Sequence, residues 1–195
     1  MYESLVINFT GPARAGKSST AAALAENQDI PIVRHSALIE QYAAQQGLSI
    51  SKDDRSTYDA AYLALDHEDP HHLTDLVLEL TLTQPLVIID GLRAYRDAQL
   101  FKAALGDQYR TATFTAPDPI RYTRDNAIRA KEGKPPRSFE GFLADEKVNA
   151  AAGYGMLDVF AMHDVSPEPI DTSKFANSRT VAAQVALYIR PYISL

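Results

Sequence analysis

A glycine-rich segment begins at Gly11 and reads GPARAGKSS, which matches the pattern GxxxxGK[ST] through Gly16, Lys17 and Ser18. An apolar run precedes the segment and a helical pattern follows it, which is the context that phosphate binding needs. Glycines let the backbone turn tightly, so that successive N–H groups point at one anion, and the following helix N-terminus adds positive potential. The segment therefore predicts a phosphate-binding loop (P-loop).

Each polar residue of the loop has an expected part in binding ATP and Mg²⁺. We expect Lys17 to bridge the β- and γ-oxygens, Ser18 to supply a hydroxyl to Mg²⁺, and Ser19 to touch the α-phosphate. The residues expected to bind the nucleotide are Gly11, Ala13, Arg14, Ala15, Gly16, Lys17, Ser18 and Ser19.

Asp90 closes the continuous apolar run LVIID. Such a run is typical of a central parallel strand that is covered on both faces. P-loop proteins place an acidic residue at this position, where it orients Mg²⁺ through its water shell, and in a kinase it can accept the acceptor's hydroxyl proton. The alternative interpretation is that Asp90 caps the turn that follows the strand.

The remaining motifs favour a small kinase over other P-loop proteins. The DxxG and NKxD motifs of GTPases are absent, and the chain is short for an ABC or recombinase-type ATPase. Asp90 opens the sequence DGLR, and a glycine and two prolines interrupt the helical pattern in RAKEGKPPR, so we expect a mobile loop there. The arginines around this loop are Arg121, Arg124, Arg129 and Arg137.

Strand-like and helix-like patterns alternate along the chain, which predicts a five-stranded parallel sheet between helices, with ligands at the carboxyl ends of the strands. We expect strands near 5–9, 30–34, 86–90 and 110–115. Helices are expected near 17–25, 36–46, 53–65, 71–83, 94–104, 119–130, 138–151, 154–162 and 178–188.

Composition limits the class of protein. The sequence is 46% hydrophobic and 23% charged, which are ordinary proportions for a globular protein. Its length of 195 residues is enough for one domain with a core. The net charge of -6 argues against an affinity dominated by nucleic-acid phosphates, although a local basic pocket would still allow a nucleic-acid end as acceptor. The absence of cysteine, of a basic leader and of long apolar runs predicts a cytoplasmic protein without membrane segments.

The motifs occur in the order P-loop, IVRHSALIEQYAAQQGL, VIIDGLR, PDPIRYTR and SFEGFLADEKVNAAAGYG. This order resembles the nucleoside monophosphate kinase superfamily, most closely its adenylate-kinase-like proteins that are often labelled dephospho-coenzyme A kinase-like. The resemblance implies a three-layer P-loop NTPase fold over residues 1–195 as a single domain. It also implies an acceptor-binding helical insert at about 35–83 and a small lid at about 124–140.

The resemblance also implies roles for individual arginines. Lid arginines close over the triphosphate in that superfamily, and the matching positions are Arg124 and Arg129, which complete a catalytic set with Lys17 and Asp90. The arginine of DGLR, Arg93, matches the residue that holds the acceptor's phosphate. The alternative is that the arginines form a solvated helix face, with Arg121 expected to stay outside the site.

One departure from the resemblance concerns the acceptor. Relatives open the helix after the second strand with a GD pair and carry an arginine three residues later, whereas this chain has Ser36, Ala37 and Glu40. A glutamate cannot replace an arginine that binds phosphate. Arg34, Arg55 or Arg93 then takes over, or the acceptor differs. The residues expected at the acceptor are Arg34, His35, Ser36 and Arg93, with neutral packing as the alternative for His35.

These features together predict an ATP-dependent phosphotransferase of the nucleotide-kinase type, which transfers the γ-phosphate to a nucleotide or a related small-molecule acceptor. One alternative is a dephospho-coenzyme A kinase or a kinase of a modified nucleotide. A second alternative is a non-catalytic ATP-binding regulatory protein. The sequence makes no prediction about oligomeric state.

Overall fold

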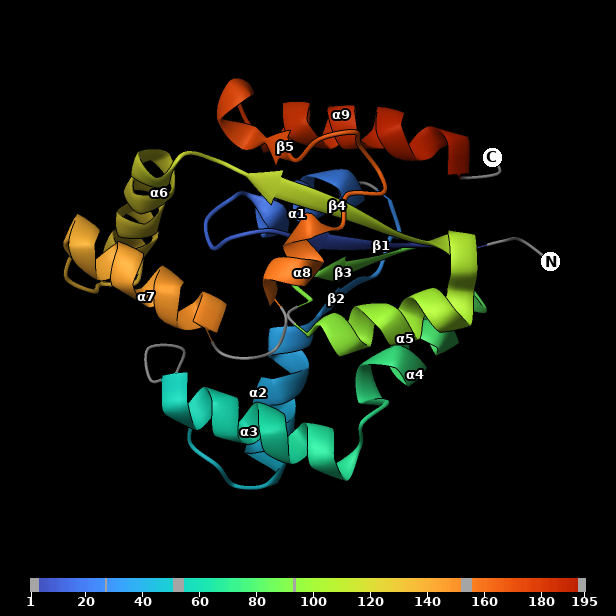
Figure 1. The fold of residues 1–195 in the computed structure, drawn as a ribbon, viewed down its shortest axis with the longest axis horizontal. Coiled ribbons are helices and arrows are strands. Elements are labelled where there is room, and N and C mark those ends of the chain that lie inside the picture. Colours follow the sequence, from blue (N-terminus) through green and yellow to red (C-terminus); the bar gives the residue numbers. More distant parts are fainter. Residues whose placement is uncertain (1–3, 27, 51–54, 93, 152–155, 193–195) are drawn as a thin grey trace.

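The computed structural model describes residues 4–26, 28–50, 55–92, 94–151 and 156–192. Within this part of the chain, five parallel strands form one sheet in the order β2-β3-β1-β4-β5, and helices lie on both of its faces (Figure 1). The predicted α/β fold with a five-stranded parallel sheet is thereby confirmed. The strands are β1 (Leu5–Thr10), β2 (Ile32–Arg34), β3 (Leu86–Asp90), β4 (Tyr109–Thr115) and β5 (Ile170–Asp171).

The helices follow the expected ranges to within a few residues, and the fifth strand, to which the sequence assigns no range, spans two residues. No helix of the described residues combines the length and the apolar character needed to cross a membrane. The helices are α1 (Lys17–Ala25), α2 (His35–Gln45), α3 (Arg55–Glu68), α4 (His72–Thr81), α5 (Tyr95–Leu105), α6 (Asp118–Lys131), α7 (Phe139–Ala151), α8 (Met156–Ala161) and α9 (Ser178–Ile189).

The sheet is buried on both faces because successive side chains of each strand point to opposite sides. Ile7 and Phe9 of β1 pack in one apolar cluster with residues of α1 and α9. Val6 packs on the other side, in a cluster that includes residues of α4, α5 and α8. This double burial explains why LVIID is a continuous apolar run up to its final aspartate, and why LVINF is apolar except for the buried Asn8.

The order of the strands creates a crevice at the carboxyl edge of the sheet. β1 and β3 are neighbours, with Phe9 paired to Asp90. The chain leaves β1 through α1 toward β2, whereas it leaves β3 through α5 toward β4, on the opposite side of β1. Connections that diverge from two adjacent parallel strands leave a gap between them, which is where open α/β sheets bind ligands. The P-loop and Asp90 both lie at this point.

Two further helical units stand beyond the sheet (Figure 1). α2 and α3 pack on each other through an apolar cluster of their own that includes Ile39 and Tyr62. α6 and α7 form the second unit, in which Tyr122 packs edge-on against Phe139 at a ring-centroid distance of 5.3 Å. The turn between α6 and α7 is fastened by Asn126, whose side chain bonds the backbone N–H and carbonyl of Arg137 at 3.0 and 3.3 Å.

The turn that leaves β1 requires glycine at position 11. Gly11 has a φ of +125°, and a Cβ atom there would lie 2.1 Å from the carbonyl oxygen of Phe114 in β4. The P-loop therefore begins in direct contact with the neighbouring strand. Gly133, after α6, also has a positive φ of +69°, but nothing lies within 4 Å of its Cβ position.

We predict that Gly11→Ala lowers the free energy of unfolding by about 2 to 4 kcal/mol, because it combines backbone strain with a clash against backbone. Gly133→Ala is the matched control, in which strain acts alone and costs about 1 kcal/mol. Urea unfolding of both variants measures the difference. Equal losses would contradict the packing role of Gly11.

Asp97, in the first turn of α5, is a buried carboxyl group that is 5% exposed. The pKa of Asp97 is raised to about 6, mainly by burial and in part by the nearby carboxylate of Asp66. The charges of Arg96 and His72 lower the pKa but do not outweigh burial. Because the folded pKa lies above the unfolded value of 3.8, the folded state binds the proton more tightly between these pH values. The Asp97 contribution to stability is therefore present at low pH and is lost as pH rises toward 6.

We predict that Asp97→Asn becomes progressively more stable relative to the natural chain as pH rises from about 4 to about 7, by about 2 to 3 kcal/mol in total. The asparagine keeps the shape of the side chain and removes its titration. Urea unfolding of both proteins across this pH range tests the expectation, with Asp75→Asn on the exposed face of α4 as the control. A stability difference that does not change with pH would rule out the burial penalty at Asp97.

Candidate active site

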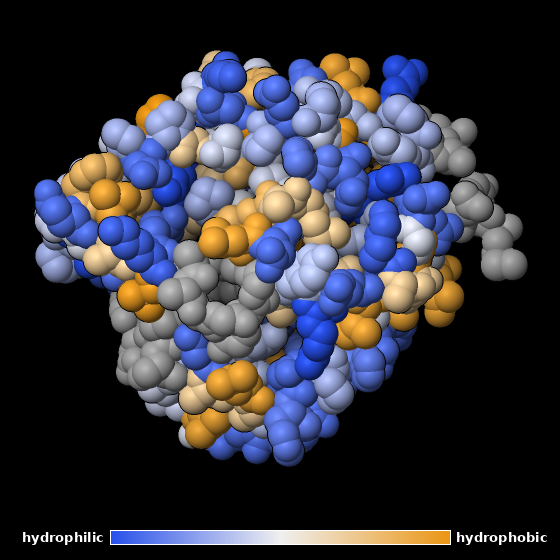
Figure 2. Space-filling view, in the orientation of Figure 1, coloured by the Kyte–Doolittle hydropathy of each residue, from blue (hydrophilic) through white to orange (hydrophobic). Residues whose placement is uncertain are grey.

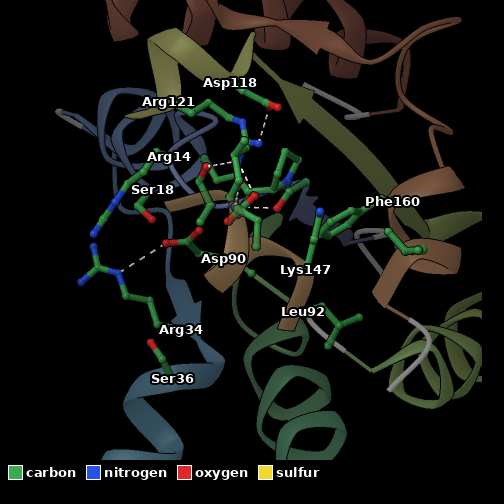
Figure 3. A pocket seen from close by; sticks show the side chains of 18 of the residues that line it. Arg14, Ser18, Arg34, Ser36, Asp90, Leu92, Asp118, Arg121, Lys147 and Phe160 are labelled. Carbon is green, nitrogen blue, oxygen red and sulfur yellow. Dashed lines mark hydrogen bonds and ion pairs between the residues drawn. The ribbon is translucent and has the colours of Figure 1, made fainter. Parts of the chain in front are cut away.

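A cavity of about 910 Å³ opens at the carboxyl edge of the sheet, where the connections that leave β1 and β3 diverge. Residues of the P-loop, of the ends of β2 and β3, and of α2, α3, α6, α7 and α8 line it. The close view in Figure 3 shows Ser18, Arg34 and Asp90 grouped on one side and Lys147, Leu92 and Phe160 on the other. Segments that are far apart in the sequence therefore meet at one site.

The P-loop has the backbone shape of an anion cradle. Arg14 and Gly16 have φ values of +63° and +95°, so left-handed residues stand on both sides of Ala15. Alternation of this kind turns successive N–H groups to one side of the loop. The Lys17 ammonium group donates to the carbonyls of Gly11 and Pro12 at 2.8 and 2.9 Å, which holds its charge at the start of the loop.

Asp90 and Arg34 are neighbours at the ends of β3 and β2. Nε of Arg34 lies 3.7 Å from Oδ2 of Asp90, whose side chain is 5% exposed, while that of Arg34 is 53% exposed. Ser18 lines the same cavity. A hydroxyl and a carboxylate oxygen are the donors that Mg²⁺ prefers, so the residues at this position fit the metal.

Eight of the residues selected from the sequence line the cavity: Gly11, Ala13, Arg14, Lys17, Ser18, Arg34, Ser36 and Asp90. Ala15 is buried, and Ser19 donates its hydroxyl to the carbonyl of Gly16 at 3.0 Å. Arg93 lies outside the described residues. The expected acceptor helix is present, but Ala37 and Glu40 do not line the cavity, whereas Ser36 does.

His35 does not line the cavity, in contrast to its expected acceptor role. Its side chain is buried, with 2% exposure, and its ring packs edge-on against Tyr62 at 5.3 Å and near His72 at 5.6 Å. His35 follows Arg34 directly, so its side chain leaves the strand end in another direction. The position of His35 therefore agrees with the alternative of packing inside the protein.

The arginines of α6 are placed differently from the expectation. Arg124 donates to the carbonyl of Arg14 at 3.1 Å and to the hydroxyl of Thr172 at 2.8 Å, and it does not line the cavity. Arg129 donates to the carbonyl of Pro135 at 2.8 Å and fastens the turn after α6. Arg121, which the sequence argument leaves outside the site, lines the cavity instead.

The charge of Arg121 is already matched by the fold. It pairs with Asp118 at 2.7 Å and with Glu146, and it donates to the carbonyl of Ala13 at 2.9 Å. Burial works against its charge, but the hydrogen bonds to Asp118 and Glu146 outweigh burial and raise the pKa of the guanidinium above its ordinary value. Arg121 therefore brings little net charge to a ligand.

Sequence reasoning missed the wall that α7 and α8 contribute. Leu143, Glu146 and Lys147 line the cavity from α7, at the spacing of one helix face, and Leu157 and Phe160 line it from α8. Lys147 is exposed. Figure 2 shows apolar surface over α8, where Leu157 is 61% exposed. The spacing of Leu143, Glu146 and Lys147, which places them on one face of a helix, was the signal in the sequence from which this wall could have been found.

The sequence matches no family model. A UPF0200 protein of Halobacterium salinarum is 25% identical over 171 residues, which are 86% of this chain and 85% of that protein. A UPF0200/UPF0201 protein of Archaeoglobus fulgidus is 27% identical over 126 residues, which are 64% of this chain. This chain spans 39% of the length of the Archaeoglobus protein. Neither name states an activity.

Solved structures share the fold over nearly the whole chain. Shikimate kinase from Acinetobacter baumannii, in complex with shikimate, superposes with a TM-score of 0.57 and 19% identity, covering 98% of this chain and 96% of that one. A gluconokinase from Sinorhizobium meliloti gives a TM-score of 0.52 and 13% identity, covering 98% and 94%. At these identities the likeness concerns the fold, and the fold is that of the P-loop kinases.

Proposed function

We propose that this protein is an ATP-dependent phosphotransferase of the nucleotide-kinase type, which moves the γ-phosphate of ATP onto a nucleotide or a related small-molecule acceptor. One observation carries the proposal: the P-loop opens into the same cavity as Asp90 and Arg34. A donor site and an acceptor site that share one cavity are what direct phosphoryl transfer needs, since catalysis rests on positioning and on positive charge.

The donor half of the site is the P-loop. Its N–H groups and Lys17 would bind the β- and γ-phosphates of ATP, and Ser18 and Asp90 would hold Mg²⁺. When bound, Mg²⁺ neutralises charge on the phosphate oxygens. The fit of the donor set to Mg²⁺ and the left-handed residues of the loop support this half of the proposal.

The acceptor half is built around Arg34 and Asp90. Arg34 binds an anionic group of the acceptor and Asp90 receives the proton of the attacking oxygen, which their 3.7 Å separation allows them to do on one small molecule. Ser36 adds a hydroxyl at the same end of the cavity. In this proposal Arg34 takes the part that the resemblance to nucleoside monophosphate kinases gives to an arginine at the position of Glu40.

The apolar wall favours an acceptor that carries a base or a similar flat group. Leu92, Leu157 and Phe160 line the cavity beside Lys147, and an acceptor made only of hydroxyl and carboxyl groups would leave this wall without contact. The solved neighbours are named for shikimate and gluconate, so the fold accepts small molecules of other kinds. A dephospho-coenzyme A kinase or a kinase of a modified nucleotide is therefore the second candidate.

Positive charge on the transferred group comes from Lys17 and, in this proposal, from Lys147 on α7. Catalytic contacts from Arg124 and Arg129 stay a prediction, because neither lines the cavity in the present arrangement and both donate to backbone carbonyls. Lys147 lines the cavity as it stands.

We predict that MgATP labelled on the γ-phosphate transfers label to one member of a panel of nucleoside monophosphates, nucleosides and dephospho-coenzyme A, and that Lys17→Ala lowers the rate at least about 100-fold. Lys131→Ala, on an exposed part of α6, is the control and should leave the rate unchanged. If MgATP binds, no acceptor gains label, and Lys17→Ala abolishes an interaction with a partner protein, the regulatory alternative holds and the kinase proposal is wrong.

We predict that Arg34→Ala and Lys147→Ala impair different parameters of the same reaction. Arg34→Ala should raise the KM of the acceptor about 10-fold or more with an unchanged KM of ATP, because it removes a charged hydrogen bond to the acceptor. Lys147→Ala should lower kcat about 10-fold with smaller effects on both KM values. Steady-state kinetics with Arg190→Ala as an exposed control measures both. If both variants changed KM and kcat in the same way, Arg34 and Lys147 would not have the separate roles proposed for them.

A further inference from the structure

Three consecutive carbonyls of the P-loop accept hydrogen bonds from side chains elsewhere in the chain. Arg121 donates to the carbonyl of residue 13 at 2.9 Å, Arg124 to that of residue 14 at 3.1 Å, and Thr172 to that of residue 15 at 2.9 Å. In a trans peptide the C=O and the following N–H point in opposite directions. Carbonyls that are held in this way fix the opposite direction of the N–H groups of residues 14 and 16, whereas the N–H of Ala15 donates to the carbonyl of Pro12 at 3.3 Å.

Within the part of the chain that the structure describes, Arg14 is the one non-glycine residue that has a positive φ. A left-handed conformation is unfavourable for a residue with a Cβ atom, so something must hold it. Nε of Arg14 donates to Oδ1 of Asp125 at 2.7 Å, and the side chain of Asp125 is 2% exposed. Asp125 also accepts from Nε of Arg137 at 2.8 Å.

This pairing separates Arg14 from the role that its position suggests. Arg14 lines the cavity, but its charge is matched by a buried carboxylate on α6. A guanidinium that is bound in this way anchors the backbone beneath it, and it offers less charge to a phosphate than a free one.

We propose that Asp125 and Arg124 are positioning residues for phosphate binding: they hold Arg14 in its left-handed conformation, so that the N–H groups of residues 14 and 16 face the β-phosphate. Arg14 then serves as a conformational anchor and is not a phosphate-binding cation. Arg124 acts on the loop in this proposal, which is an alternative to its predicted contact with the transferring phosphoryl group. The proposal rests on the proposed function only in that the cavity binds a nucleoside diphosphate or triphosphate.

Two substitutions of Arg14 test the anchor. Glycine adopts the left-handed conformation without strain, whereas alanine is strained there and has no side chain for Asp125 to hold. We expect Arg14→Gly to keep the affinity for MgADP within about two-fold, and Arg14→Ala to lose about five-fold or more, by isothermal titration calorimetry. An equal loss in both variants would mean that Arg14 binds the phosphate by its charge, and would overturn the proposal.

A double-mutant cycle then tests Asp125. Asp125→Asn should weaken MgADP binding in the natural chain but should cost nothing further in Arg14→Gly, because no strained residue is left to hold. Arg137 also pairs with the exposed carboxylate of Asp145, so Asp145→Asn controls for effects that act through Arg137. The same loss from Asp125→Asn in both backgrounds would refute the positioning role. Should Asp125→Asn not fold, the comparison of the two Arg14 variants decides alone.

Failure of this proposal and failure of the proposed function are distinguishable, since MgADP binding needs no transfer. A chain that binds MgADP with the expected pattern but never transfers phosphate keeps the anchor and loses the kinase function. A natural chain that binds neither MgADP nor MgGDP has no phosphate cradle, and that result overturns the positioning role as well.

Discussion

Backbone N–H groups that face a phosphate cannot also be bonded by the fold, so a phosphate-binding loop has to be held through its carbonyls and side chains. Two arginines of α6 and Thr172 donate to the carbonyls of residues 13–15, and Asp125 holds the side chain of Arg14. The sheet fixes the beginning of the loop, because Gly11 touches β4. The loop is thus shaped by helix α6 as much as by its own glycines.

The same contacts explain how positive charge is divided around the cavity. Arginines of α6 are engaged by carboxylates or by backbone carbonyls, which uses their fixed geometry and multiple donors to join segments of the fold. Lysines supply charge toward the cavity, with Lys17 at the P-loop and Lys147 on α7. Arg34 differs from the α6 arginines because its side chain is 53% exposed and lies beside a single carboxylate, that of Asp90. This division separates residues that organise the site from residues that can contact a ligand.

The acceptor is decided by the walls that surround a common donor loop. Shikimate kinase and gluconokinase share the fold at low identity, and one fold carries many acceptors, so the donor half says little about the second substrate. In the function proposed above, the walls around the acceptor come from α2, α3 and α8 together with the ends of β2 and β3, all of which line the cavity. Their combination of one basic residue, one carboxylate and an apolar surface is what our proposed acceptor class is based on.

The local features of this protein could be predicted from the sequence because contiguous residues encode them. The P-loop with Lys17 and Ser18, the strand that ends in Asp90, and the alternation of strands and helices all belong to this group, and so does the parallel sheet that the alternation implies. The directions of side chains on α6 and α7 could not be predicted, because a rotation of a helix by one position changes which residue meets the loop. Arg14 and Asp125 are 111 residues apart, and no local pattern links them. Tertiary packing alone therefore decided that Arg121 and not Arg124 lines the cavity, that His35 is buried, and that Lys147 lines the site.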